Sequence, residues 1–323
     1  MLFLSLALME KRKFPKSKVR WLSVLIFLVI IIKFAASNSS WVEISYSNQF
    51  YSGFSYLLRI LFGWIPFSFG DILYLAAILW IVWKVFIFIK LLFTRRLSWR
   101  GVKNGVVKTF FIFVILYIVF NLFWGLNYNR SGIANQLNLS TSKVDTADLK
   151  LLQLLLLQRV NESKQSLINS HTVYPSNKEM FARAQNCYIG AVKIYPYLKY
   201  RCKSIKSSLY GWWGNYLGFT GYYDPFTGEA QVNTTIPAFM RPYTTCHEMA
   251  HQIGYAKEEE ANFVGYLAVI SSNDTLFHYS AYLDLFVYAN RELYFIDSSS
   301  AKAAASMLLP AVKKDIREWR EFV

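Results

Sequence analysis

Acidic residues, cysteine and histidine are all scarce in this chain of 323 residues. It has 20 Asp and Glu against 35 Lys and Arg, which gives a formal net charge of +15 at pH 7. Three cysteines, Cys187, Cys202 and Cys246, are too few for a disulfide scaffold, although Cys187 and Cys202 could pair in an oxidising compartment. Charged residues make up only 17% of the chain and hydrophobic residues 54%, a balance that favours a membrane protein over a soluble one.

The positive charge lies beside apolar runs. Residues 1–20 contain six Lys and Arg, and residues 94–108 contain five with no acid between them. Neither segment carries a nucleic-acid-binding motif, so we interpret the charge as a signal of membrane topology and expect no nucleic-acid partner. Basic segments beside spanning helices are typical of the cytoplasmic side.

Three apolar stretches are long enough to cross a lipid bilayer. They cover about 21–37, 71–93 and 109–128, and a span needs about 20 residues. A signal peptide is the alternative for the first stretch, but its length and the spans that follow favour a retained anchor. Residues 1–128 are therefore predicted to form a membrane anchor with a cytoplasmic N-terminus, and residues 129–323 an extracytoplasmic domain.

A fourth apolar segment, residues 50–70, is interrupted by Gly53, Gly63 and Pro66. These residues disfavour a continuous spanning helix, so we expect a segment that lies in the membrane interface. The alternative, a fourth span, would place the C-terminal domain in the cytoplasm.

The C-terminal half is more polar and is predicted to be α+β and mainly helical. A leucine stripe, helix caps and a Gly- and aromatic-rich stretch from residue 207 carry this prediction. Helices are expected at 144–168, 176–195, 242–253, from near 257, and at 280–292 and 301–321, with a short strand at 229–233.

The stretch TTCHEMAHQIGYAKEEEAN, residues 244–262, contains two of the four histidines. His247 and His251 are four residues apart, so on a helix both rings leave the same face and can hold one metal ion. Glu248 follows the first histidine, where a carboxylate can act as the general base of a zinc hydrolase. Pro242 suits the start of this helix and Gly254 its end.

Two histidines leave a tetrahedral zinc site one protein ligand short. The chain turns at Gly254 and begins a new helix near Lys257, which brings Glu258, Glu259 and Glu260 back toward His251. Glu258 is the predicted third ligand because it shares an open, polar helix face with Asn262, and Glu260 remains the alternative.

The combination resembles the gluzincin arrangement of thermolysin-like metallopeptidases, in which HExxH is followed by a helix with ExxxD or ExxAN. The resemblance implies that His247, His251 and Glu258 bind zinc, that Glu248 is the base, and that Asn262 orients a ligand histidine. Only six residues separate His251 from Glu258, fewer than in those families.

The pattern GYYDPFTGEAQVN followed by HEMAHQIGYAKEEEANFVGYLA also resembles an uncharacterised family of bacterial membrane proteins with a domain of unknown function. That resemblance implies a multi-pass protein of the bacterial plasma membrane. It supports the fold and the topology better than it supports a substrate.

In zincin-like peptidases an edge strand beside the active-site helix pairs with the substrate backbone. The candidate strand consists of Gly228, Glu229, Ala230, Gln231, Val232 and Asn233. The sequence thus predicts a membrane-anchored zinc metallopeptidase acting on a peptide or protein substrate. The alternative is a non-catalytic membrane scaffold with a structural or vestigial metal site.

Overall fold

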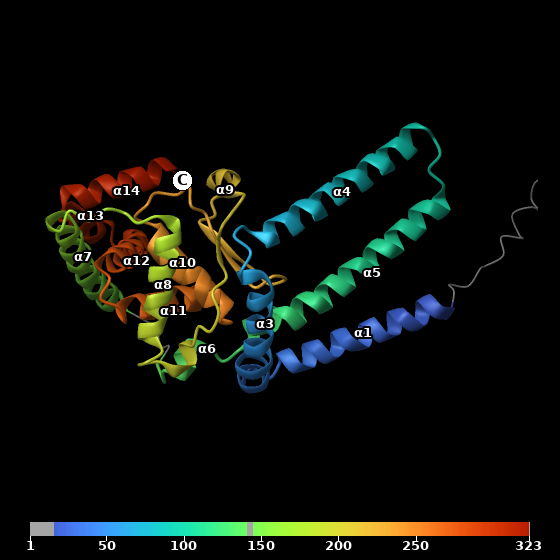
Figure 1. The fold of residues 1–323 in the computed structure, drawn as a ribbon, viewed down its shortest axis with the longest axis horizontal. Coiled ribbons are helices and arrows are strands. Elements are labelled where there is room, and N and C mark those ends of the chain that lie inside the picture. Colours follow the sequence, from blue (N-terminus) through green and yellow to red (C-terminus); the bar gives the residue numbers. More distant parts are fainter. Residues whose placement is uncertain (1–15, 141–144, 323) are drawn as a thin grey trace, which may run out of the picture.

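The computed structural model describes residues 16–140 and 145–322, and its fold is mainly helical with one small sheet (Figure 1). The α-helices are α1 Lys16–Ala36, α2 Ser39–Trp41, α3 Ser52–Gly63, α4 Phe69–Phe93, α5 Trp99–Phe123, α6 Gly132–Gln136, α7 Thr146–Asn169, α8 Asn177–Ala191, α9 Gly211–Leu217, α10 Arg241–Gln252, α11 Glu258–Ile270, α12 Thr275–Ile296, α13 Ser298–Ser306 and α14 Pro310–Phe322. A π-helix, η1 Val42–Tyr51, and two 3-10 helices, η2 Gly125–Asn129 and η3 Pro196–Leu198, complete the helical elements.

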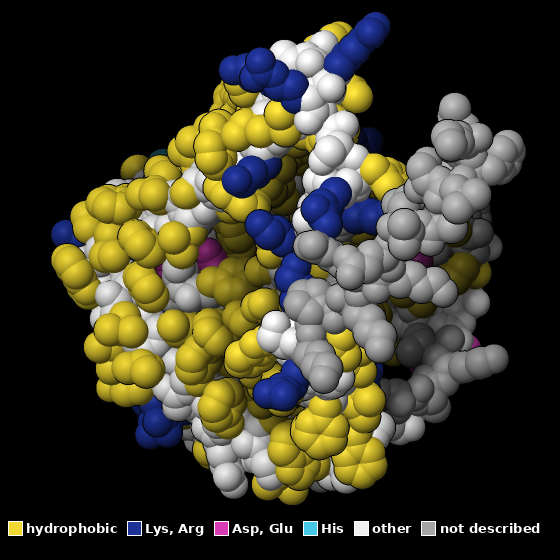
Figure 2. Space-filling model, turned by 90° about the vertical axis from the view of Figure 1, so that its right-hand side faces the viewer, with side chains coloured by type: hydrophobic (Ala, Val, Ile, Leu, Met, Phe, Trp, Pro, Cys, Tyr) yellow, Lys and Arg dark blue, Asp and Glu magenta, His cyan; other side chains and the backbone are white. Residues whose placement is uncertain are grey.

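Three helices, α1, α4 and α5, are long and apolar enough to cross a membrane. They extend together from one side of the folded C-terminal part, and almost none of their apolar surface is buried against protein (Figure 1). Seen from the free ends of these helices, the molecule shows mostly hydrophobic side chains, with Lys and Arg gathered near the viewer (Figure 2). The three predicted membrane helices are confirmed as apolar helices of spanning length.

The third of these helices is displaced from its predicted range of 109–128. Helix α5 begins at Trp99, where the Ser98 side chain accepts a hydrogen bond from the Gly101 backbone N–H. It ends at Phe123 because Trp124 leaves the helical conformation with φ −158°, and the chain continues as η2. The basic residues of the loop therefore belong partly to the helix, and the last predicted residues of the span do not.

The segment at 50–70 contains the last residues of η1 and all of α3, which follows η1 without a break, and neither is among the described helices that are long and apolar enough to span. One face of α3 is buried through Ser55, Leu58 and Arg59, while Leu57, Ile60 and Leu61 are exposed. Its C-terminal carbonyl, that of Gly63, accepts a hydrogen bond from Lys206 Nζ at 2.9 Å. This segment is thus packed on the C-terminal part, and its position in the membrane interface remains a prediction.

The Gly- and aromatic-rich stretch folds into three strands, β1 Ile205–Ser207, β2 Gly221–Asp224 and β3 Glu229–Val232. Their order is β1-β3-β2, with β3 parallel to β1 and antiparallel to β2. The predicted strand therefore exists, but it is the central one.

A boundary at 128/129 does not divide the chain into two separately packed units. One of the hydrophobic cores contains Tyr51 and Trp124 from the N-terminal half together with Tyr223 and Ala256 from the C-terminal half. Sequence reasoning placed the boundary where hydropathy falls, but Trp124, directly after α5, packs into this core instead of facing lipid.

The last predicted helix, 301–321, is two helices. Pro310 has no N–H to donate and suits the first position of a helix, so α13 ends before it and α14 begins with it.

Candidate metal centre

Helix α10 presents the two histidines on one face. Pro242 lies in its first turn, and Gly254, with φ +93°, allows the chain to reverse direction just beyond its end. The Nε2 atoms of His247 and His251 lie 3.1 Å apart, and the two rings meet edge to face. This spacing allows both nitrogens to point at one position.

Glu258 opens α11 and completes the group. Its carboxylate oxygens lie 3.2 Å from His247 Nε2 and 3.6 Å from His251 Nε2. One potential ligand atom from each of these three residues lies within 4.8 Å of the others. The two histidines lower the pKa of Glu258, so its carboxylate stays charged. Two imidazoles and one carboxylate are a donor set that suits Zn²⁺.

Glu260, the alternative third ligand, points elsewhere. Its carboxylate lies 3.5 Å from Lys257 Nζ and packs so closely on Gly132 that any side chain there would collide with it. Glu260 is absent from the ligand group, and Glu259, between the two, is exposed. The structure thus brings Glu258 to the histidines.

Glu248 lies in the same helix turn as His247 and is only 3% exposed. Its Oε2 atom has no hydrogen-bond partner among the described residues. Burial raises the pKa of Glu248, and the nearby Glu258 adds to this while His247 and His251 oppose it. The carboxylate fits because Gly221 has no side chain: a Cβ there would lie 2.5 Å from Glu248 Oε1.

His251 is held in a defined tautomer. Its Nδ1 lies 2.7 Å from the carbonyl oxygen of Tyr255, which can only accept, so Nδ1 carries the proton and Nε2 keeps its lone pair. Trp124 Nε1 donates to the His251 carbonyl at 3.3 Å, and the two rings meet edge to face at 6.0 Å.

The surroundings of His247 include two polar residues from other helices. Burial opposes protonation of His247, but Glu258, Glu248 and the side chain of Asn262 outweigh it and raise its pKa. Asn262, predicted to orient a ligand histidine, therefore lies beside His247. Asp284 of α12 is the second neighbour, and burial raises its pKa to about 6, against the effect of His247. Sequence analysis missed Asp284, although an acid within the apolar run YLDLF was a usable signal.

The N-terminal half holds the turn that joins α10 to α11. Tyr51 donates its hydroxyl to the Gln252 carbonyl at 3.0 Å, and Arg130 Nη1 donates to the Gly254 carbonyl at 2.9 Å. The Arg130 guanidinium also lies 4.2 Å above the ring of Tyr255 and forms an ion pair with Glu43 at 2.6 Å. Tyr51 and Glu43, from before the predicted domain boundary, thus help Arg130 to hold the turn that leads to Glu258.

The prediction that Gly228–Asn233 forms an edge strand is wrong. Its core, β3, is hydrogen-bonded to β1 on one side and β2 on the other through Ala230, Gln231 and Val232, so it offers no free edge. Glu229 and Gly228 instead face the N-terminal half: the Glu229 carboxylate accepts the Gly70 backbone N–H at 2.7 Å, and Gly228 packs on Leu58. Asn233 lies beyond the strand and accepts from Thr235. The edge strand nearest Glu248 is β2.

All three thiols are free, with Cys187 and Cys246 buried and Cys202 partly exposed. Cys187 lies against Cys246, whose pKa is raised by burial and by that neighbour. The pairing of Cys187 with Cys202 that the sequence left open is not formed.

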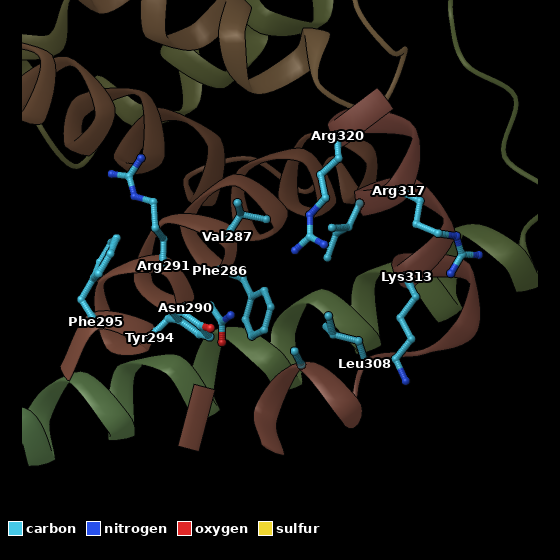
Figure 3. A pocket seen from close by; sticks show the side chains of 12 residues that line it. Phe286, Val287, Asn290, Arg291, Tyr294, Phe295, Leu308, Lys313, Arg317 and Arg320 are labelled. Carbon is cyan, nitrogen blue, oxygen red and sulfur yellow. The ribbon is translucent and has the colours of Figure 1, made fainter. Parts of the chain in front are cut away.

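A separate cavity of about 610 Å³ lies between α12 and α14 (Figure 3). Phe286 and Leu308 contribute apolar walls, and Arg291, Arg317 and Arg320 lie around it (Figure 3). Its lining includes no His, Cys, Asp or Glu, so it is not a rival metal site.

Three apolar helices of spanning length and a cluster of two histidines and one glutamate define a membrane-associated protein with a candidate metal site. The chain belongs to the family described as "Protein of unknown function (DUF3810)", whose model matches residues 46–323. No curated protein and no solved structure matches the chain. The family match includes α4, α5 and the whole of the candidate site, which joins the apolar helices and the cluster in one family.

Proposed function

We propose that this protein is a membrane-anchored zinc metallopeptidase. The observation that carries the proposal is the convergence of His247, His251 and Glu258 within 4.8 Å, with Glu248 buried beside them. Three protein ligands leave a fourth position of zinc open, which is typical of catalytic sites. Zinc bound there would polarise a carbonyl group and lower the pKa of a water molecule toward 7.

Glu248 is the proposed general base. A buried carboxylate with a raised pKa accepts a proton more readily than an exposed one, and Glu248 Oε2 has no competing hydrogen bond. Glu248 would then deliver the proton to the leaving amine. The free edge of β2 is the proposed place for an extended substrate backbone, because Gly221 on that strand contacts Glu248.

For the topology we propose a multi-pass protein of the bacterial plasma membrane with its N-terminus in the cytoplasm. The basic segments 1–20 and 94–108 support this side, and three spans then carry the metal centre to the extracytoplasmic side.

The competing function is a non-catalytic membrane scaffold with a structural metal. Such a site would require a fourth protein ligand, and Glu260, the alternative third ligand, would be the nearest acid in sequence to supply it. Glu260 faces Lys257 and Gly132, and the side chain of Glu258 is 75% exposed, so the group is open on one side. This openness favours catalysis.

The test uses the full chain purified in detergent, because the N-terminal half holds the ligand turn. We expect about one zinc per chain in the parent and in Glu248→Gln, and none in His247→Ala. Glu248→Gln should lose hydrolysis of peptide substrates by about 10²–10⁴-fold, the usual contribution of a general base. Glu259→Gln is the matched control, since Glu259 is exposed and should change neither property.

Three results would contradict the proposal. Undiminished zinc content in His247→Ala would remove the metal site from these residues. Full hydrolysis by Glu248→Gln, with zinc bound, would exclude Glu248 as the general base. Absence of hydrolysis by the zinc-loaded parent would leave the scaffold as the better explanation.

A further inference from the structure

Helix α9 exposes large apolar side chains with no protein partner in the described structure. Trp212, Trp213, Tyr216 and Leu217 are each more than half exposed, and Leu217 is 74% exposed. The preceding Leu209 is exposed as well. Exposed clusters of this kind normally mark contact with another protein or with a membrane.

The location of α9 points to the membrane. The backbone N–H of Leu209 donates to Asp71 Oδ2 at 2.6 Å, and the Tyr210 hydroxyl donates to the Asp71 carbonyl at 2.6 Å. Asp71 lies in the first turn of α4, one of the three spanning helices, so α9 begins where α4 leaves the folded part (Figure 1). The cluster is thus continuous with the exposed apolar surface of α4, a helix of spanning length.

Helix α3 adds a second exposed apolar surface, which also lies beside the start of α4. Leu57, Ile60, Leu61 and Trp64 follow one another at helical spacing and are exposed, while the opposite face packs on the C-terminal part. Phe62, near the end of α3, stacks on Phe69 at the start of α4 with ring centroids 5.0 Å apart. In the view from the free ends of the long helices, hydrophobic side chains cover much of the surface around them (Figure 2).

The candidate metal centre is close to the end of α5. Trp124 directly follows α5 and contacts the ring of His251, and its ring also meets that of Tyr128 at 5.2 Å. Tyr128 is half-exposed and near Glu258, whose charge contributes to the raised pKa of Tyr128 after the effect of burial. Tyr128 lies in η2, five residues after the last residue of α5, and a 3-10 helix rises only about 2 Å per residue, so Tyr128 stays near that end of α5. The exposed side of the centre therefore lies near the end of α5.

We propose that the exposed apolar side chains of α3 and α9, here called the apolar collar, are embedded in the leaflet next to the folded part, and that the metal centre acts on substrates anchored in that leaflet. The apolar collar consists of Leu57, Ile60, Leu61, Trp64, Leu209, Trp212, Trp213, Tyr216 and Leu217. Trp and Tyr are the side chains that favour the interface. The substrate part rests on the proposed function, and the embedding does not.

The embedding is tested with nitroxide labels in the full chain, reconstituted in vesicles of phosphatidylcholine and phosphatidylglycerol. Cys202→Ser removes the partly exposed thiol, and Leu217→Cys then takes the label. Phe295→Cys is the matched control, because Phe295 is an equally exposed apolar residue, at 79%, on α12. We expect the label at 217 to collide more often with oxygen than with a water-soluble nickel chelate, and the label at 295 to show the reverse. Equal chelate access at both positions would overturn the embedding.

The substrate class is tested with fluorogenic peptides of random sequence, either free or carrying a palmitoyl chain, added to the same proteoliposomes. We expect the palmitoylated peptides to be hydrolysed at least about tenfold faster, since anchoring raises their local concentration. A variant with Trp212→Ser, Trp213→Ser and Leu217→Ser should lose most of this advantage while it keeps its zinc.

The two proposals fail in different ways. Equal hydrolysis of both peptide forms would overturn the anchored-substrate class and leave the peptidase. Hydrolysis of neither form by the zinc-loaded parent would count against the peptidase and its substrate class together, while the labels at 217 and 295 would still decide the embedding.

Discussion

Two groups of buried charged residues lie on either side of the turn between α10 and α11, and they differ in how far their polar atoms are satisfied. Both carboxylate oxygens of Glu43 accept hydrogen bonds from Arg130, at 2.6 and 2.9 Å, and Gln136 adds a third at 2.6 Å. In contrast, the buried Oε2 oxygen of Glu248 and the buried Nδ1 nitrogen of His247 have no hydrogen-bond partner among the described residues.

The difference separates residues that stabilise the fold from residues that are available for chemistry. A buried ion pair whose hydrogen bonds are complete fixes the turn and has no capacity left for a ligand. A buried carboxylate with a free oxygen costs stability, and such a cost is typical of functional sites. The predictions below test this contrast from the largest expected effect to the smallest.

Removing one partner of the satisfied pair should have the largest effect on stability. Arg130→Met leaves Glu43 buried and unpaired, and we expect a loss of about 3–5 kcal/mol in the free energy of unfolding. Denaturant unfolding in detergent measures it. The double variant Arg130→Met/Glu43→Leu should recover part of the loss. A single variant as stable as the parent would show that the pair does not hold the turn.

Exchanging the acids of α11 should affect zinc affinity unequally. Glu258→Gln removes a proposed ligand, and we expect at least about a 100-fold weaker zinc affinity, the upper end of what indirect ligand partners contribute. Glu260→Gln, two residues further along α11, should leave the affinity within about threefold. Competition with a zinc-binding dye measures both, and the opposite ranking would make Glu260 the ligand.

Asp224 offers a further pH test, because it is fully buried and no Lys or Arg among the described residues contributes to its pKa. Burial, with a contribution from Glu229, raises the pKa of Asp224 to about 6, although the Phe226 N–H opposes this. The unfolded chain releases this proton near pH 4, so Asp224 lowers stability progressively as pH rises from about 4 to about 6. We expect a change of about 1–3 kcal/mol, visible as the difference in thermal unfolding between the parent and Asp224→Asn.

Glu43 should behave in the opposite sense, which supplies the control. Burial favours its neutral form, but Arg130 and Gln136 outweigh burial and lower the pKa of Glu43. Its stabilisation is therefore present above pH 4.5 and is lost as pH falls below that value. A parent and Asp224→Asn with parallel pH profiles would contradict the assignment to Asp224.

The smallest effect is expected for the ion pair of Lys257 and Glu260, whose lysine is partly exposed. Its atoms lie 3.5 Å apart and the lysine side chain is 39% exposed, so solvent screens the interaction. Lys257→Met should change the free energy of unfolding by less than about 1 kcal/mol. A loss of unfolding free energy as large as that of Arg130→Met would mean that burial does not explain why the two ion pairs differ.

Local patterns in the sequence predicted much of the fold. Helix caps and periodicity placed α7, α8, α10 and α11 within a few residues, and hydropathy found the three long helices. The end of α5 was missed because Trp124 is apolar enough to continue a span but packs on His251 instead. The break at Pro310 was readable and was overlooked.

At the candidate site, the i, i+4 spacing predicted that His247 and His251 share one helix face. In the structure their Nε2 atoms lie 3.1 Å apart. Asp284, Gly221 and Tyr128 were not found, because each comes from a distant element and reaches the site only through packing. The role of β3 was misjudged for a similar reason: a strand's sequence does not say how many neighbours pair with it.

The sequence by itself determined which segments are helical, which are apolar enough for lipid, and that two imidazoles share one helix face, because these properties depend on residues a few positions apart. Only the tertiary structure decided that Glu258 and not Glu260 meets the histidines, that β2 and not β3 has the free edge, and that Arg130 and Tyr51 hold the turn between the ligands. Those outcomes depend on contacts between residues far apart in the chain, which no local pattern encodes.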